Sequence, residues 1–200
     1  MATIIDLGDP NAPLPDYLLL DASVLLRLLF GDAKIVQFVD RVAQAYRDGD
    51  TIALVCILTL EECYHKIIQR EYERDLDPSL QRFRQTTANK RGIPLGHVRW
   101  HDLYKERPRF IGHYLTDIDA FFQMVARIPV HVLEPEDLAD STLSSPPIEP
   151  RMRDIMRSYY LLGKDAYMVA IAERLKVQHI ATLDPDFQRL GPNFTLHTIV

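Results

Sequence analysis

Two aspartates each follow directly on a short apolar stretch of the chain. Asp21 comes after residues 17–20, and Asp184 comes after residues 179–183. If these stretches are neighbouring parallel strands, both carboxylates lie at the same carboxyl edge of one sheet, where α/β folds bind their ligands. Like charges this close need a cation between them, and carboxylate oxygens suit Mg²⁺ or Mn²⁺. The sequence therefore predicts a metal-dependent enzyme.

Further acidic side chains can join this edge. Asp165 begins an alanine-rich helix, where a carboxylate also interacts favourably with the helix dipole. Glu61 and Glu62 follow the second predicted strand, on the helix that begins there, and only one of them need face the cluster. Asp186 is expected to be a secondary or solvent-facing acid.

The elements that must position these acids alternate between strands and helices. Short apolar stretches predict strands, and 3.6-residue periodicity predicts helices. Strands are expected at residues 17–20, 51–56, 130–133, 179–183 and 195–200, and helices from about residue 23 and over 33–47, 59–71, 110–127, 152–162 and 165–175. Residues 1–16 are expected to be a tail, and residues 134–150 an exposed connection. The alternation predicts an α/β fold with a mainly parallel sheet.

The composition suits one domain of 200 residues with a sizeable core, since 47% of the residues are hydrophobic. The net charge of -5 argues against a uniformly basic nucleic-acid binder. One local exception exists: residues 82–109 carry eight basic and two acidic side chains, a net of +6, which leaves −11 for the rest of the chain. We expect residues 72–109 to be a basic helix-and-loop insertion in this single domain.

The two cysteines, Cys56 and Cys63, are expected to be buried core residues in a reducing compartment, although Cys63 and His65 could form half of a zinc site. No signal peptide is indicated, and the apolar stretch at residues 18–30 is too short to cross a bilayer. We therefore expect a cytoplasmic protein without a membrane partner.

Four motifs of the chain together resemble the PIN-domain family of metal-dependent ribonucleases, to which the VapC-type toxins belong. They are residues 18–23 at the first strand, 58–62 after the second, 164–166 at the start of the late helix, and 181–187 at the penultimate strand. The resemblance covers roughly residues 17–71 and 110–190. It implies a three-layer α/β/α PIN-like fold with a mainly parallel central sheet, interrupted by the insertion.

Carried over position by position, the family's catalytic acids fall on four residues: Asp21, Glu62, Asp165 and Asp184. The metal ligands implied are Asp21, Asp165 and Asp184, with Asp186 as a further acid. Glu61 remains an alternative to Glu62, because in helical phase it lies nearer to the apolar residues of its helix. Ser23 and Thr182 could support a carboxylate or a metal-bound water, or could satisfy local backbone groups.

The resemblance implies an endoribonuclease, either the toxin of a toxin–antitoxin pair or a stand-alone RNase. One or two Mg²⁺ or Mn²⁺ ions would activate water, orient the phosphodiester and neutralise the leaving oxygen, so no Ser, Cys or His nucleophile is needed. The partners implied are RNA, an antitoxin or other inhibitory protein, and a second copy of the chain. The length of the insertion is unlike the compact toxins.

Two alternatives stay open. The chain could be an inactive PIN-like module that binds RNA or protein, although all four acidic positions are filled. A phosphotransferase or phosphatase with an aspartyl nucleophile would need an acid two residues after Asp21, where Ser23 stands.

The basic insertion has a functional and a structural interpretation. Lys90, Arg91, Arg107 and Arg109 could bind RNA phosphates while Trp100 or Tyr104 stacks on bases. Alternatively, the segment is a solvated basic helix and loop with Trp100 in a small satellite core.

Overall fold

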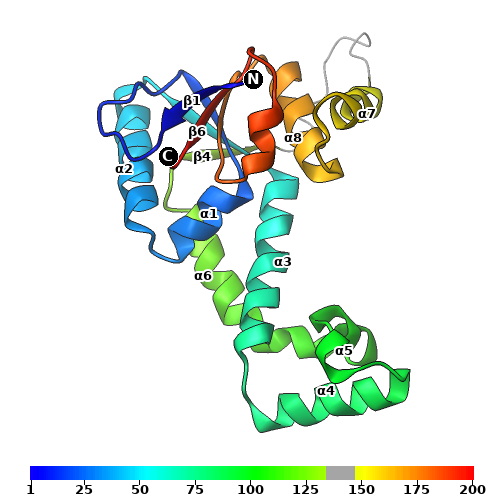
Figure 1. The fold of residues 1–200 in the computed structure, drawn as a ribbon. Coiled ribbons are helices and arrows are strands. Elements are labelled where there is room, and N and C mark those ends of the chain that lie inside the picture. Colours follow the sequence, from blue (N-terminus) through cyan, green and yellow to red (C-terminus); the bar gives the residue numbers. More distant parts are fainter. Residues whose placement is uncertain (134–146) are drawn as a thin grey trace. The chain divides into compact units, whose positions relative to one another are not determined.

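The computed structural model describes residues 1–133 and 147–200 (Figure 1). Among these, six strands form one sheet in which every neighbouring pair is parallel, in the order β1-β6-β5-β2-β3-β4. The strands are β1 (Thr3–Asp6), β2 (Tyr17–Leu20), β3 (Ile52–Cys56), β4 (Val130–Leu133), β5 (His179–Ala181) and β6 (Thr195–Thr198). The expected α/β class with a parallel sheet is confirmed.

The strand order contains a reversal at β2. From β2 the chain adds β3 and then β4 on one side, and it later adds β5 and then β6 on the other side. Ligand sites of open parallel sheets lie outside the carboxyl ends of the strands at such a reversal. A ligand site is therefore expected where β2 and β5 end.

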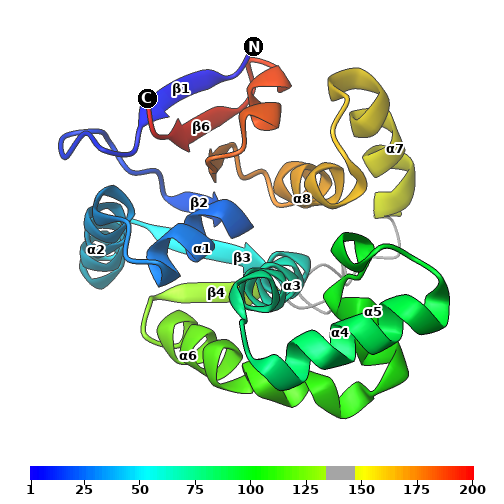
Figure 2. The same ribbon diagram turned by 60° about the horizontal axis from the view of Figure 1, so that its bottom comes forward.

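Side chains of successive residues point to opposite faces of this sheet, and both faces are buried. Leu19, Leu54, Ile180 and Leu196 are in register across four strands and pack into one core with α7 (Ile148–Tyr159) and α8 (Gly163–Arg174). The opposite face includes His197, whose ring lies 6.5 Å from that of Phe38 in α2 (Ala33–Asp48). Figures 1 and 2 draw α1 (Ala22–Leu29) and α2 apart from α7 and α8, with strands between them, which agrees with a three-layer arrangement.

The helix α2 has a cap at each end. Asp32 accepts hydrogen bonds from two backbone amides at the start of α2, and Gly49 ends that helix in the left-handed conformation (φ 84°) that glycine adopts without strain. The helix α3 (Ile57–Arg74) begins immediately after β3, two residues before the expected start, so Thr59 lies inside the helix and does not cap it.

The described chain divides into two compact units. The first contains residues 1–61 and 124–200, and the second contains Glu62–Gln123. The boundaries fall within α3 and within α6 (Leu115–Val125). The basic insertion expected at residues 72–109 is thus the middle of a longer unit. Its remaining elements are α4 (Pro78–Arg91), η1 (Leu95–His97), α5 (Trp100–Glu106) and η2 (Pro108–Tyr114).

The second unit has its own small core. Ile68, Tyr72, Leu80, Leu103 and Phe110 are buried together in it. The polar helix α4 is held by caps, since Asp77 accepts hydrogen bonds at its start, Pro78 occupies its first turn and Gly92 ends it at φ 64°. A buried core of this kind is more than a solvated loop would have.

Two expectations need correction. The N-terminal segment is not wholly a tail, because residues 3–6 form the edge strand β1 beside β6. The helix expected over 110–127 is shorter, because residues 110–114 belong to the 3₁₀ segment η2. The connection expected at 134–150 lies mostly outside the described residues, and α7 already begins at Ile148.

None of the helices in the described part of the chain combines the length and the apolar character needed to span a membrane.

Candidate active site

Asp21 and Asp184 lie at the predicted edge of the sheet. β2 and β5 are parallel neighbours with Leu20 paired to Ala181, so Asp21 and Thr182 are the next pair beyond the strands. The backbone amide of Asp21 donates to the carbonyl of Ala181 at 2.9 Å, which continues the strand pairing to the acid itself. Asp184 follows two residues after Thr182. The reversal between β2 and β5 therefore has an aspartate on each side.

The carboxylate of Asp21 is held by a network of hydroxyl groups. Asp21 is buried (7% exposed), and its Oδ2 accepts from Ser23 Oγ at 2.5 Å, from Thr182 Oγ1 at 2.9 Å and from the Ser23 amide at 3.3 Å. All three donors reach the same oxygen, which leaves Oδ1 without a donor among the described residues. Such a network orients a carboxylate for a second interaction.

The same hydroxyls also connect the two acids. Ser23 Oγ accepts from the Leu183 amide at 2.9 Å, and Thr182 Oγ1 accepts from the Asp184 amide at 3.0 Å. Both supporting roles left open for Ser23 and Thr182 are thus filled at once, because each hydroxyl donates to a carboxylate and accepts from the backbone. The turn that carries Asp184 is therefore fastened to Asp21.

Asp184 itself begins a short helix. Its Oδ1 accepts from the Asp186 amide at 2.8 Å, which makes it the cap of η3 (Pro185–Arg189). Asp186 pairs with Arg189 at 2.6 Å, and the same guanidinium donates to the carbonyl of Tyr160 at 3.0 Å. A metal ion would have to compete with Arg189 for Asp186, so the structure lends no support to Asp186 as a ligand.

Asp165 lies in the first turn of α8 and is half-buried. The helix is followed by only four residues before β5, so it runs back antiparallel to the strands, and its first turn comes at their carboxyl ends. Asp21 and Thr182 have the same parity as Leu19 and Ile180, whose face α8 covers. The topology thus places Asp165 at the same edge and on the same face as Asp21.

The two glutamates fall on either side of the unit boundary. Glu61 ends the first part of the first unit and is exposed, whereas Glu62 begins the second unit and is half-buried. The helical phase expected for α3 is wrong in one respect: Ile57 is 42% exposed, and the buried side of the helix contains Leu60 and Cys63. In helical phase the two glutamates lie equally far from Leu60 and Cys63, so only their exposure distinguishes them. The role of either glutamate stays a prediction.

In the described part of the chain, no group of three or more His, Cys, Asp or Glu side chains is arranged to hold a metal ion. This includes Cys63 and His65, the half-site considered from the sequence. The carboxylates and hydroxyls at the sheet edge are nevertheless of the chemical type that Mg²⁺ and Mn²⁺ prefer.

The four basic residues expected to bind RNA have partners within the second unit in three cases. Lys90 forms an ion pair with Glu106, and Arg91 Nη1 lies 2.5 Å from Asp102 Oδ1. The Arg107 guanidinium lies 4.8 Å from the ring centre of Phe83, while Arg109 is exposed.

A pair of histidines was not singled out from the sequence. His179 Nδ1 and His197 Nε2 lie 3.0 Å apart on neighbouring strands. Burial, followed by repulsion from His179 and Arg41, lowers the pKa of His197 to about 4. Burial also lowers the pKa of His179, and Asp16 partly offsets this. The signal in the sequence was a histidine in each of two apolar strands. The two strands pair so that both histidines lie on one face of the sheet, two positions out of register.

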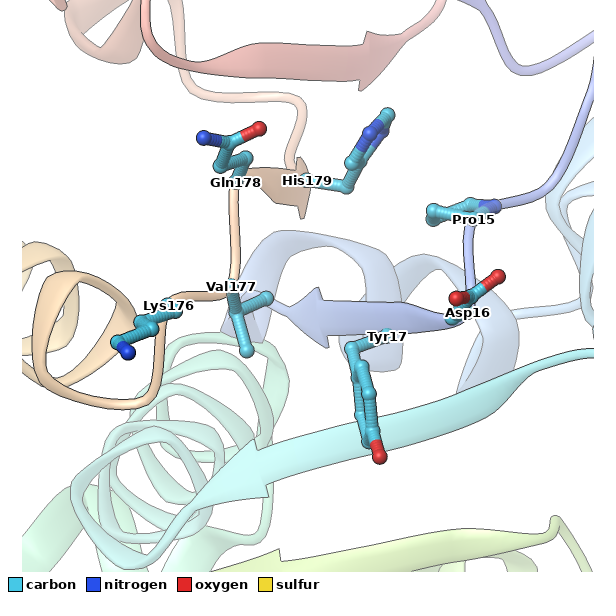
Figure 3. A pocket seen from close by; sticks show the side chains of 7 residues that line it. All are labelled: Pro15, Asp16, Tyr17, Lys176, Val177, Gln178 and His179. Carbon is cyan, nitrogen blue, oxygen red and sulfur yellow. The ribbon is translucent and has the colours of Figure 1, made fainter.

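His179 also borders a hollow of about 300 Å³ at the opposite edge of the sheet. Figure 3 shows its lining, which comes from the residues that lead into β2, among them Asp16 and Tyr17, and from residues 176–179 before and at the start of β5. Because it adjoins the amino ends of these strands, it is separate from the edge that carries Asp21 and Asp184.

No protein-family model matches this sequence, and no curated protein matches it.

Proposed function

We propose that this chain is a metal-dependent endoribonuclease of the PIN-domain type, which hydrolyses phosphodiester bonds in single-stranded or looped RNA. The observation that carries the proposal is the pair of aspartates at the ends of adjacent parallel strands, with Asp21 buried and oriented by two hydroxyl groups. Buried carboxylates are costly, and their concentration at a strand reversal is typical of a functional site.

The residues that would hold the cation are Asp21, Asp165 and Asp184. Asp21 would use Oδ1, because Oδ2 is occupied by Ser23 and Thr182. When bound, Mg²⁺ or Mn²⁺ would supply an activated water and positive charge for the leaving oxygen. We expect all three acids at the carboxyl edge from their sequence positions and the topology. Their carboxylate oxygens suit Mg²⁺ or Mn²⁺ better than metals that prefer nitrogen or sulfur ligands.

The side chains of the protein would do the remaining work by positioning. Ser23 and Thr182 keep the Asp21 carboxylate in one orientation, and their bonds to the Leu183 and Asp184 amides keep the second acid at a fixed place beside it. Preorganised ligands of this kind do not have to rearrange when the substrate binds. Glu62 is proposed as a further catalytic acid from its position in the motif alone.

The direct test is RNA hydrolysis by Asp21→Asn. Asparagine keeps the shape of the side chain but removes the ligand charge, so activity on a mixed RNA pool with Mg²⁺ or Mn²⁺ should fall by about 100-fold or more while the fold is retained. EDTA should abolish RNA hydrolysis by the unaltered protein. Asp16→Asn is the matched control, because Asp16 is exposed and precedes the same strand at its other end.

Cleavage that survives both EDTA and Asp21→Asn would refute the proposal. Equal losses in the two asparagine variants would mean that the effect comes from charge or folding and not from the candidate site.

A second candidate is an inactive PIN-like module that binds RNA or protein. It is favoured by the lack, among the described residues, of three acidic side chains grouped tightly enough to hold a metal ion. The same experiment separates the two candidates, since an inactive module would bind RNA without cleaving it in any divalent cation.

We also propose a cytoplasmic location, because the two cysteines, Cys56 and Cys63, are buried thiols and not a disulfide, as is usual in a reducing compartment. An antitoxin or other inhibitory protein and a second copy of the chain are proposed as partners on the resemblance alone.

A further inference from the structure

The second unit contains a hollow that none of the four expected RNA-binding residues borders. Its volume is about 340 Å³, within the range of small-ligand sites. It lies between α3, α4 and the start of α5, so it belongs to the second unit alone. Its chemically distinctive lining residues are Tyr72, Arg84, Arg99, Trp100 and His101.

Arg84 gives this hollow an unusual cation. Its guanidinium lies 4.4 Å from the ring centre of Tyr72, and its Nε is fully enclosed yet has no hydrogen-bond partner among the described residues. Because Nε itself has no exposed surface, an anionic oxygen of a ligand in the hollow would bind to the other guanidinium nitrogens of Arg84, which lines it. The Tyr72 hydroxyl beside it donates its proton to the Val98 carbonyl at 2.8 Å, so it has no proton to donate to a ligand.

Arg99 provides a second cation at the mouth. Its side chain is exposed, and its backbone amide is fixed at the start of α5 by Asp102 Oδ2 at 2.9 Å. The acid that lines the same hollow, Glu73, is exposed and accepts a hydrogen bond from Gln69 at 2.9 Å. The lining thus has two guanidinium groups against one solvated carboxylate.

Trp100 adds an aromatic surface next to these cations. It is half-buried against the small core, with the rings of His65 and His101 at 5.6 and 5.9 Å. An anchored indole that is only partly covered can stack on a nucleobase, and guanidinium groups nearby can bind the phosphate of the same nucleotide.

We infer that this hollow binds one nucleotide of single-stranded RNA, with the base on Trp100 and the phosphate on Arg84 and Arg99. The inference rests on the proposed ribonuclease function and names the surface that would hold its substrate. It also moves the RNA contact away from Lys90 and Arg91, whose charges are already paired with Glu106 and Asp102.

Trp100 is the only tryptophan of the chain, so its fluorescence reports on this hollow directly. The intact protein is titrated with decauridylate in EDTA, which prevents cleavage. Saturable quenching by decauridylate, with none from inorganic phosphate at equal phosphate concentration, is the expected result. A lack of quenching by the RNA, or equal quenching by inorganic phosphate, would overturn the inference.

Variants then locate the contact. Arg84→Gln with Arg99→Gln should weaken binding of labelled decauridylate at least about tenfold and reduce the log–log salt slope by about 0.7, the value for the loss of one phosphate contact on a single strand. The matched control is Arg153→Gln with Arg157→Gln, two exposed arginines of α7, which changes the net charge equally. Equal effects of the two double variants would overturn the inference.

Two single variants keep the inference testable if the double variant does not fold. Arg99→Gln alters an exposed side chain and should weaken binding of the labelled RNA on its own, by less than the double variant does. Trp100→Phe, followed by anisotropy of the labelled RNA, should weaken binding several-fold by loss of stacking surface.

The outcomes also separate this inference from the proposed function. Quenching without hydrolysis in any divalent cation would refute the proposed ribonuclease activity and leave the RNA site supported. Hydrolysis that continues unchanged in all the pocket variants, without quenching by RNA, would refute the RNA site and leave the proposed ribonuclease activity supported.

Discussion

The carboxylate of Asp21 is the most enclosed acid of the candidate site. Burying a charged group is unfavourable unless hydrogen bonds compensate, and here Ser23 and Thr182 supply them. Because Thr182 also accepts from the Asp184 amide, one methyl-for-hydroxyl exchange would disturb both acids. The role of this threonine can therefore be measured as stability as well as activity.

Thr182→Val should lower the free energy of unfolding by about 1–3 kcal/mol, because it leaves a buried carboxylate and an amide short of a partner. The control is Thr51→Val. Thr51 is equally buried (1% exposed), but its Oγ1 has no partner among the described residues, so valine should be neutral or stabilising there. Urea denaturation of both variants measures the difference. Similar losses would show that the network contributes little.

The buried pair of histidines should make stability depend on pH. Because the pKa of His197 is lowered to about 4, the unfolded chain takes up a proton below about pH 6.5 while the folded protein does not. Stability should therefore fall as the pH drops from about 6.5 towards 4, by about 2 kcal/mol between pH 7 and 5.

His197→Leu removes this titration and should flatten the decline, as measured by urea denaturation at several pH values. Replacement of the exposed His97 by leucine controls for the loss of one imidazole. A decline in His197→Leu as steep as in the unaltered protein would rule out His197 as its source.

At the level of elements, ion pairs connect α4 to α5. Arg91, near the end of α4, contacts both Asp102 and Glu106 of α5, and its side chain is 26% exposed. Partly buried pairs of this geometry contribute more than exposed ones. The basic residues of this segment thus have a structural role that their number in the sequence does not reveal.

Arg91→Gln should lower the stability of the second unit by about 1–2 kcal/mol, followed by the fluorescence of Trp100 in α5 during urea denaturation. Arg109→Gln, which changes an exposed side chain, should stay within about 0.5 kcal/mol of the unaltered protein. If Arg109→Gln is as destabilising as Arg91→Gln, the paired geometry is not the reason.

The sequence predicted the elements of the sheet well where the apolar stretches were long or regular. β2 and β4 have the expected bounds, and Asp21 lies where it was expected. β2 is buried on both faces and is therefore a continuous apolar stretch, whereas β4 has an exposed histidine among its apolar residues. Ser23 and Thr182 were expected to support a carboxylate or the backbone, but the sequence did not show that each does both. The bond between Ser23 and Leu183 depends on a contact between residues far apart in sequence.

Other elements were missed for identifiable reasons. β1 has only four residues and two of them are exposed, so it forms because β6 is there to pair with it. α4 has few apolar side chains, and its signals were its caps, an aspartate and a proline at one end and a glycine at the other. Tertiary contacts decide both elements, and local periodicity does not show them.

At the scale of the whole chain, β1 is the edge strand on one side of the sheet and covers β6. It pairs with β6 through four residues, and Leu7, just beyond it, is almost fully buried. An uncovered strand edge exposes backbone groups that can pair with other chains. β1 therefore protects β6 from such pairing.

Deletion of residues 1–7 should lower the melting temperature by several degrees and produce aggregates, detected by size-exclusion chromatography. Deletion of residues 1 and 2 alone, which leaves β1 intact, is the control. A protein without residues 1–7 that is as stable and as monodisperse as the control would show that β6 does not need its neighbour.

The order of strands along the chain also has a consequence for synthesis on the ribosome. Residues 62–123 are contiguous and can fold as soon as they emerge, but β2 acquires its neighbour β5 only when residues 179–181 have left the exit tunnel. Until then Asp21 lacks Thr182, and Asp184 is either not yet made or still inside the tunnel. On the proposed function, a nascent chain would carry its RNA-binding surface before its candidate active site is complete, so the ribosome and message producing it would be spared while the chain is being made.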